Sequence, residues 1–210
     1  MGDGKLLITQ SLLSAWSYLY ACQEGQEDNA REDFERTLRR ERSEPTEAMQ
    51  NGIDFEREVY KKAARLPRKP HEKWERGIDA VATVIKGAPV QVKLSRDIEV
   101  SGRKFLLYGI LDALKAGIIY DVKFTNKSLT SSSPSYSVGK YLESAQHPVY
   151  FGLVPEAYEF HYLVSDGVDL CTEAYRREAS RPVTEIIAEF MASVESMGLL
   201  PLYMEKWAAK

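Results

Sequence analysis

Residues 106–125 contain two apolar runs of strand length separated by a short polar break, and this pattern constrains the fold more than any other part of the chain. Each run carries one aspartate, Asp112 in the first and Asp121 in the second. A buried strand tolerates a carboxylate only where the carboxylate has a partner or a function, because an unpaired buried charge is costly. We therefore expect a functional site on these two strands.

The break predicts a hairpin in which Ala116 and Gly117 form a two-residue loop. In that register Asp112 lies directly opposite Asp121, with the Cβ atoms roughly 5 Å apart. Because side chains alternate along a strand, Lys123 shares a face with Asp121. Alanine is unfavourable at the positive φ that a tight hairpin loop requires, so a longer loop is the alternative.

Two carboxylates side by side repel each other unless a divalent cation lies between them or one of them is protonated. Mg²⁺ suits such a pair because it prefers hard oxygen ligands and retains water and substrate phosphate around it. A nearby ammonium group can assist an attacking water or stabilise developing negative charge. An exposed hairpin with solvated charges is the alternative for an isolated D-x-K triplet, and the apolar surroundings argue against it here.

Three motifs in order resemble those of the PD-(D/E)XK nuclease superfamily, and within it the RecB-like exonuclease branch. They are Gly109-Ile110-Leu111-Asp112 for G-x-x-D, Asp121-Val122-Lys123 for D-x-K, and Gln146-His147-Pro148-Val149-Tyr150 for Q-x-x-x-Y. Flanking features extend the resemblance over about residues 11–163. The resemblance implies a restriction-endonuclease-like core and a metal-dependent deoxyribonuclease.

The resemblance also implies roles for the motif residues. Asp112, Asp121 and the Val122 carbonyl would hold Mg²⁺, for which Mn²⁺ can substitute. Lys123 would assist the attacking water or stabilise the charge of the pentavalent phosphorus. Gln146 and Tyr150 would orient the DNA phosphate or the scissile end.

A carboxylate on a preceding helix is expected to complete the metal site. In the resembling family a helical acid or histidine in a G-x-x-x-E/H context helps to hold the metal, and Gly52 and Glu56 match that spacing. Asp54 and Glu58 lie close enough in the sequence to be confused with Glu56. The alternative is that Glu56 pairs with a lysine or arginine at the rim of the helix.

Two segments are candidates for phosphate contacts. Residues 61–69, called the basic segment below, begin with Lys61 and Lys62 and contain no acid. Clustered cations of this kind neutralise phosphates, although cations near the negative end of a helix are an equally good explanation. Lys127 lies in a serine-rich loop over residues 125–139, which either connects two elements or closes over bound substrate.

Periodicity predicts an α/β (α+β) protein with a central, mostly antiparallel or mixed sheet of about four strands flanked by helices. The expected strands cover residues 90–97, the two arms of the hairpin, and residues 158–164, with the first three pairing in order. The expected helices cover about residues 11–24, 46–66, 77–86, 138–153 and 183–194. In the helix over 46–66 the predicted inward stripe is Met49, Ile53, Tyr60 and Ala63.

These elements predict one nuclease domain over residues 1–210. Residues 1–70 form its helical N-terminal part or cap, residues 89–165 the sheet core with the motifs, and residues 180–210 a C-terminal helix and tail. The tail, with Trp207, is expected to pack back on the core or to reach a neighbouring subunit. The sequence leaves the oligomeric state open.

Composition excludes several classes of protein. Hydrophobic residues make up 44% and charged residues 28% of the 210 residues, which argues against both a membrane protein and a disordered chain. Residues 1–10 lack the apolar core of a signal peptide, so a cytoplasmic location is expected. Cys22 and Cys171 are the two cysteines, and without a further cluster no iron–sulfur or zinc site is expected.

The net charge of −3 means that binding to DNA requires a local basic surface. The leading hypothesis is an exonuclease that acts on the ends of linear duplex or single-stranded DNA in recombination, repair or phage DNA metabolism. A single-strand-annealing or single-strand-binding protein of recombination is the protein partner that fits this hypothesis. The alternatives are a DNA-binding or assembly module without catalysis, a structure-specific endonuclease and a restriction-type endonuclease.

Overall fold

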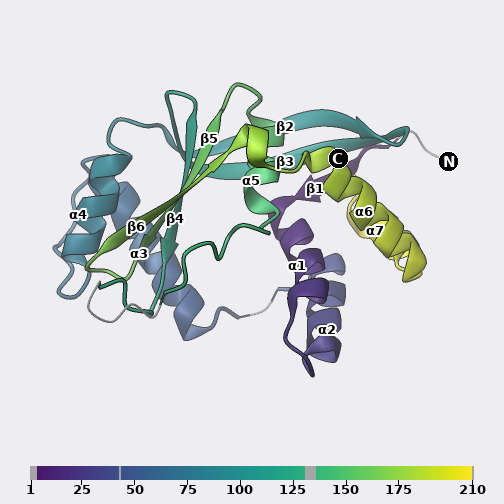
Figure 1. Ribbon diagram of the computed structural model, residues 1–210, viewed down its shortest axis with the longest axis horizontal. Helices are drawn as coiled ribbons and strands as arrows, with labels where there is room; N and C mark the ends of the chain where they lie inside the picture. Colours follow the sequence, from purple (N-terminus) through teal and green to yellow (C-terminus); the bar gives the residue numbers. More distant parts are fainter. Residues whose placement is uncertain (1–3, 43, 131–135, 210) are drawn as a thin grey trace.

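The computed structural model describes residues 4–42, 44–130 and 136–209, and within them a mixed sheet lies between two layers of helices (Figure 1). The sheet has six strands, in which β1, β3, β4, β5 and β6 follow one another and β2 also pairs with β3. Pairing is parallel for β1 with β3 and for β4 with β5, and antiparallel elsewhere. The predicted α/β class with a mixed sheet is therefore confirmed.

The strands are β1 (Leu6–Thr9), β2 (Val90–Val100), β3 (Arg103–Lys115), β4 (Ile118–Phe124), β5 (Glu159–Ser165) and β6 (Leu170–Arg176). The helices are α1 (Gln10–Ala21), α2 (Glu27–Leu38), α3 (Glu47–Ala63), α4 (Glu75–Val84), α5 (Gln146–Leu153), α6 (Val183–Ser196) and α7 (Leu200–Lys206). A short 3-10 turn, Arg177–Ala179, follows β6.

Each face of the sheet has its own hydrophobic core. On one face, Phe55 and Val59 of α3 and Ile78 of α4 pack against Val122 of β4 and Leu163 of β5. On the other face, the larger core is built from α1, α2, α5, α6 and α7 against the opposite side chains of the strands. The strand that carries Asp121 is thus covered on both sides, as expected for a near-continuous apolar sequence.

The hairpin between β3 and β4 has the predicted two-residue loop. Ala116 and Gly117 have φ values of +52° and +78°, and Lys115 pairs with Ile118. The positive φ at Ala116 shows that the alanine adopts the conformation that the turn imposes. The longer loop is excluded.

The N-terminal part contains the helices α1, α2 and α3 after the short strand β1. Thr9 caps α1 by accepting a hydrogen bond from the backbone N–H of Leu12, whereas Ser11 lies within the helix. In α2 the charged side chains form ion pairs one turn apart, such as Arg31 with Glu35 at 3.2 Å. This helix is a solvated one whose inner face buries Phe34 and Leu38.

Three predictions about the elements are wrong in part. The sheet has β1 and β6 in addition to the four expected strands. The helix expected over residues 138–153 starts at Gln146, since Pro148 lacks an N–H and fits without cost only in the first turn of a helix. In α3, Met49 and Ile53 are exposed, and the inward face carries Phe55 and Val59 instead.

The C-terminal segment packs back on the N-terminal helices. Trp207 is buried, and its indole N–H donates to the Leu38 carbonyl at 2.9 Å. Among the described residues no single helix is both long and apolar enough to cross a membrane, and the pair over 177–196 and 200–206, which passes by length and composition only, is bent by 118°.

Candidate active site

The site lies where the sheet splits along one edge of β3. Residues 105–108 of β3 pair with β1, and residues 113–115 pair with β4. The residues from Gly109 to Asp112 lie between these two ladders, so this edge has no strand partner along the G-x-x-D motif. A gap of this kind exposes backbone groups that side chains can bind.

Asp112 takes the place of the missing strand pairing. Its Oδ2 accepts a hydrogen bond from the backbone N–H of Val122 at 2.8 Å, and its Oδ1 accepts one from Gln91 Nε2 at 3.1 Å. The expected register would place Asp112 opposite Asp121, but the regular pairs end at Ala113 and Tyr120. The carboxylate therefore holds β3 and β4 together at the point where they diverge.

Asp121 is buried and contacts two of the predicted site residues. Its Oδ1 accepts a short hydrogen bond from Gln146 Nε2, and its Oδ2 lies 2.7 Å from Lys123 Nζ. The Oδ2 contact is an ion pair without the direction of a hydrogen bond, so that buried oxygen has no directed donor. The Lys123 side chain is 29% exposed.

Glu56 of α3 is the helical acid that joins this group. Burial, and then the negative charge of Asp112, raise the pKa of Glu56 to about 8, and Lys123 acts in the opposite direction. Its neighbours Asp54 and Glu58 are engaged elsewhere, by Arg57 and by Lys61 respectively. Glu56, rather than either neighbour, faces the two aspartates.

The charges in this site do not balance. Burial, and then the charge of Asp121, raise the pKa of Asp112, and burial raises the pKa of Asp121 as well. Three carboxyl groups, from Asp112, Asp121 and Glu56, are opposed by the ammonium group of Lys123. Such an excess of carboxylates favours either proton uptake or the binding of a cation.

The donor set fits a cation that keeps part of its water. In residues 4–42, 44–130 and 136–209 no three His, Cys, Asp or Glu side chains converge closely enough to enclose an ion by themselves. Two carboxylates with a nearby main-chain carbonyl, water and substrate oxygens are, however, the ligands that Mg²⁺ accepts. The Asp121 Oδ2 atom, which lacks a directed donor, is the oxygen that is most available for this role.

Comparisons with known proteins give a likeness of overall structure only. No protein-family model matches the chain, and no curated protein is similar to it in sequence. A solved structure described as SSO0001 is 13% identical, with 92% of this chain and 79% of that chain covered and a TM-score of 0.49. LHK-Exo in complex with dAMP is 14% identical, with coverage of 93% and 91% and a TM-score of 0.48. Neither likeness assigns the chain to a family.

Tyr150 fills the gap in the sheet. Its hydroxyl donates to the Ile110 carbonyl at 2.9 Å, and its ring lies against Gly109, where a Cβ atom would be 2.6 Å from Tyr150 Cε1. Gln146, one turn earlier in α5, bonds to Asp121. Gln146 and Tyr150 of the Q-x-x-x-Y motif thus hold Asp121 and the edge of β3 in place, and Tyr150 is 7% exposed.

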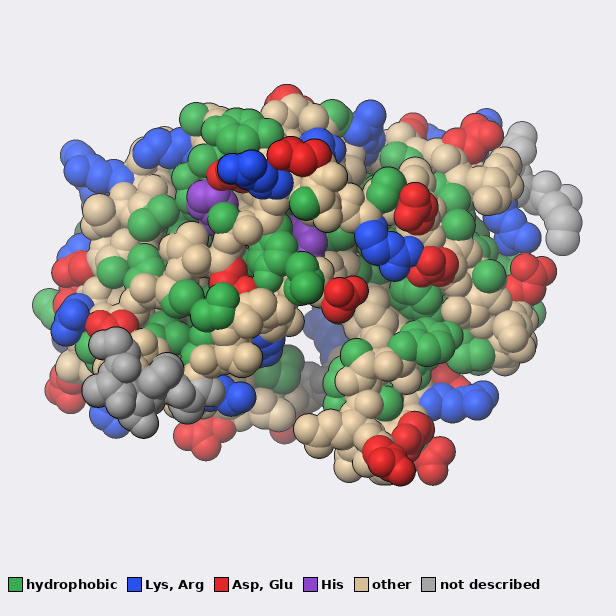
Figure 2. Space-filling view, viewed as in Figure 1, with side chains coloured by type: hydrophobic (Ala, Val, Ile, Leu, Met, Phe, Trp, Pro, Cys, Tyr) green, Lys and Arg blue, Asp and Glu red, His purple; other side chains and the backbone are tan. Residues whose placement is uncertain are grey.

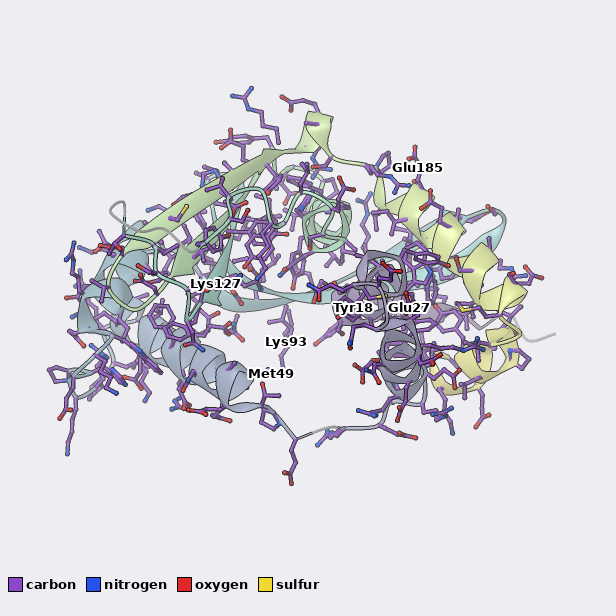
Figure 3. All side chains as sticks on the ribbon, turned by 60° about the horizontal axis from the view of Figure 1, so that its bottom comes forward. Tyr18, Glu27, Met49, Lys93, Lys127 and Glu185 are labelled. Carbon is purple, nitrogen blue, oxygen red and sulfur yellow. The ribbon has the colours of Figure 1, made fainter. Side chains whose placement is uncertain are left out.

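The predicted phosphate-contact lysines lie in different surroundings. Lys61 pairs with Glu58 at 2.8 Å and Lys62 with Asp79 at 2.5 Å, while the nearly buried Arg68 of the same basic segment pairs with Glu58 at 3.0 Å. Lys127 is exposed on the loop after β4 (Figure 3). Ion pairs therefore connect the basic segment to Glu58 of α3 and Asp79 of α4. Phosphate contacts by Lys61 or Lys62 would compete with these ion pairs. The prediction that the serine-rich loop closes over bound substrate falls partly on residues 131–135, which lie outside the described part of the chain.

One face of the molecule is hollowed beside these elements. Figure 2 shows an opening between the side that holds α3 and α4 and the side that holds α1 and α2, with Lys or Arg side chains visible inside it. In Figure 3, Lys93 of β2 points into the space between α3 and α1, and Tyr18 lies on the α1 side of that space. Tyr18 is 49% exposed. An exposed aromatic ring and a cation in a hollow are suited to a nucleic-acid strand.

Sequence reasoning missed two residues beside Asp112. Gln91 donates to it, and the buried Tyr60 hydroxyl lies beside it and opposes the rise in the pKa of Asp112. Tyr60 follows Glu56 by one turn, so the helical spacing could have indicated it. Gln91 carries no such signal, because the alternation of β2 predicts a solvent-facing side chain.

His147, adjacent to Gln146, is a structural residue. It is 3% exposed, its Nδ1 lies 3.2 Å from the Tyr162 hydroxyl, and its ring stacks on Tyr175 at 4.7 Å. These contacts give His147 a packing role in the core. Burial lowers the pKa of His147 to about 4.

The low pKa of His147 predicts a loss of stability in mild acid. Between the unfolded pKa of about 6.5 and the folded value, the unfolded chain binds a proton that the folded chain does not, so stability falls as the pH falls. Relative to His147→Gln, the wild type should lose about 2 kcal/mol of unfolding free energy between pH 7.5 and pH 5. Urea unfolding of both proteins at the two pH values measures this difference. An equal loss in the two proteins would contradict the assignment.

Proposed function

We propose that this protein is a metal-dependent deoxyribonuclease that hydrolyses phosphodiester bonds, and that it acts on DNA ends. The observation that carries the proposal is the meeting of Asp112, Asp121, Lys123 and Glu56, from β3, β4 and α3, in one partly buried site. The excess of carboxylates over cations there is the reason to expect a bound divalent ion.

The chain's own residues can be given roles on this proposal. Asp112, Asp121 and the Val122 carbonyl would hold Mg²⁺ or Mn²⁺, with Glu56 bound directly or through a water. When bound, the ion would supply charge stabilisation to the phosphate and acidify a water. Lys123 would hold its proton, orient the attacking water and oppose the negative charge that develops on the phosphate oxygens.

The surroundings of the site support a nucleic-acid substrate. Lys93 and Tyr18 lie at the hollow between α3 and α1, where a cation can contact phosphate and an aromatic ring can stack on a base, and Lys127 lies on the loop after β4. Gln146 and Tyr150 would fix the position of Asp121 and of the edge of β3. Lys61 and Lys62 remain candidates for contacts further along the strand.

The test is cleavage of end-labelled linear duplex, linear single strand and closed circular DNA. With Mg²⁺ or Mn²⁺ we expect progressive loss of the linear molecules, no loss of the circle, and no cleavage in EDTA. Cleavage of the circle would support an endonuclease instead. A protein that bound the DNA but cut none of the three substrates with either metal would contradict the nuclease proposal.

A further inference from the structure

Gln91 has a backbone conformation that glutamine rarely adopts. Its φ is +54°, in the left-handed region that favours glycine, although it lies within β2. The residues on either side of it pair regularly with β3, but the pair that Gln91 would form with Asp112 is missing from the ladder. The strand is therefore locally distorted directly opposite a residue of the proposed metal site.

The side chain of Gln91 is directed at that residue. Its Nε2 donates to Asp112 Oδ1 at 3.1 Å, while the backbone N–H of Val122 donates to Oδ2 at 2.8 Å. One donor on each oxygen fixes the plane of the carboxylate, and the Tyr60 hydroxyl lies beside it. A strained backbone persists only where the surrounding contacts hold it, and such strain concentrates at functional sites.

An open space lies beside the hydrogen bond between Gln91 and Asp112. A cavity of 390 Å³ beside α3 is lined by Glu56, Tyr60 and Gln91, among other residues. Gln91 is the donor that holds Asp112 on the side of this cavity, and without its amide the carboxylate would be free to turn about its contacts with Val122 and the adjacent Tyr60 hydroxyl. The Asp112 carboxylate would then no longer be oriented toward Asp121.

We propose that Gln91 is a positioning residue, held in a strained conformation so that its amide orients the Asp112 carboxylate for the metal ion. The inference rests on the proposed function, because Asp112 is a ligand only if the site binds a metal. It predicts opposite effects of one substitution on stability and on metal affinity. Gln91→Gly removes the strain together with the hydrogen bond.

The experiment measures Mn²⁺ binding by electron paramagnetic resonance and thermal unfolding without metal. The proteins are the wild type, Gln91→Gly, Gln91→Met and Ser101→Gly. Gln91→Met keeps the length and the strain but has no donor. Ser101→Gly is the matched control, because Ser101 has a φ of +52° at the exposed turn after β2.

We expect the dissociation constant for Mn²⁺ to rise about tenfold in both Gln91 variants and to stay unchanged in Ser101→Gly. The melting temperature should rise by about 1–4 °C in Gln91→Gly and in Ser101→Gly, and it should not rise in Gln91→Met. Wild-type affinity for Mn²⁺ in either Gln91 variant, or an equal loss in Ser101→Gly, would overturn the positioning role alone. Failure of the wild type to bind Mn²⁺ would overturn the metal site and the positioning role together.

Discussion

Replacing Asp121 with asparagine is expected to lower the rate of metal-dependent DNA cleavage on the order of 10³-fold while the protein stays folded. Asparagine keeps an oxygen that can accept the hydrogen bond from Gln146, but it removes the charge that faces Lys123. The Lys123 ammonium retains the carboxyl groups of Asp112 and Glu56 as neighbours, so it is not left as an isolated buried ion. Single-turnover cleavage of end-labelled duplex, with Mg²⁺ in excess, measures the effect.

The matched control for this substitution is Asp97→Asn. Asp97 is an exposed aspartate of β2 that pairs with Lys5, and its side chain is 61% exposed. Removing its charge should leave cleavage within about twofold of wild type, since surface ion pairs contribute little. If Asp121→Asn cleaved DNA as fast as Asp97→Asn, the assignment of Asp121 to the metal site would be wrong. Circular dichroism of both variants would separate lost activity from lost folding.

The local part of this site could be predicted from the sequence, because a two-residue hairpin loop fixes the register of its strands. Ala116 and Gly117 form that loop, and the first pairs beyond it have the predicted register. The ladder then ends before Asp112, while β4 continues along β5, with which it pairs in parallel from Ile118 to Phe124. The partner strand β5 lies some forty positions later in the chain, so no local sequence pattern predicts where β3 and β4 separate.

Of the two strands that were missed, β1 is non-local in the same way, whereas β6 pairs with the preceding strand β5 across the turn at residues 166–169. β1 has four residues and pairs with the middle of a strand about a hundred positions away. Its sequence, Leu6-Leu7-Ile8-Thr9, does not alternate apolar and polar residues, so no strand pattern marks it. Only the position of β1 and β4 on one edge of β3 reveals the gap that Tyr150 and Asp112 fill.

The helix that carries Glu56 shows how a partly wrong prediction can still indicate the right residue. Met49 and Ile53 were placed inside but are exposed, while Phe55 and Val59 are buried. Glu56 lies beside this buried stripe, at its edge, and so reaches the site without entering the core. Because apolar side chains occur on both faces of α3, periodicity alone could not select the inner one.

The second large effect is expected for Gly109→Val, which should lower the free energy of unfolding by about 3 kcal/mol or more. A Cβ atom at this position would lie 2.6 Å from Tyr150 Cε1 and 2.8 Å from Leu153 Cδ1. Both neighbours are buried in α5, so the clash can be relieved only by moving that helix. The same movement would draw Gln146 away from Asp121, and cleavage should fall even in the fraction that remains folded. Urea unfolding and single-turnover cleavage measure the two losses.

Gly52, the other glycine that the motifs indicate, supplies the control. A Cβ atom at Gly52 would meet nothing within 4 Å, and the residue lies inside α3, so Gly52→Ala should raise the free energy of unfolding by about 0.5–1 kcal/mol. A double-mutant cycle of Gly109→Ala with Tyr150→Ala tests the cause directly, because the alanine should cost less once the ring is gone. Additive losses in that cycle, or a Gly109→Val protein as stable as wild type, would show that the glycine of the G-x-x-D motif is not there to admit Tyr150. A coupling free energy of the expected sign would show that the G-x-x-D and Q-x-x-x-Y motifs pack as one unit. In this unit the small Gly109 leaves room for the Tyr150 ring, which covers the edge of the sheet beside Asp112.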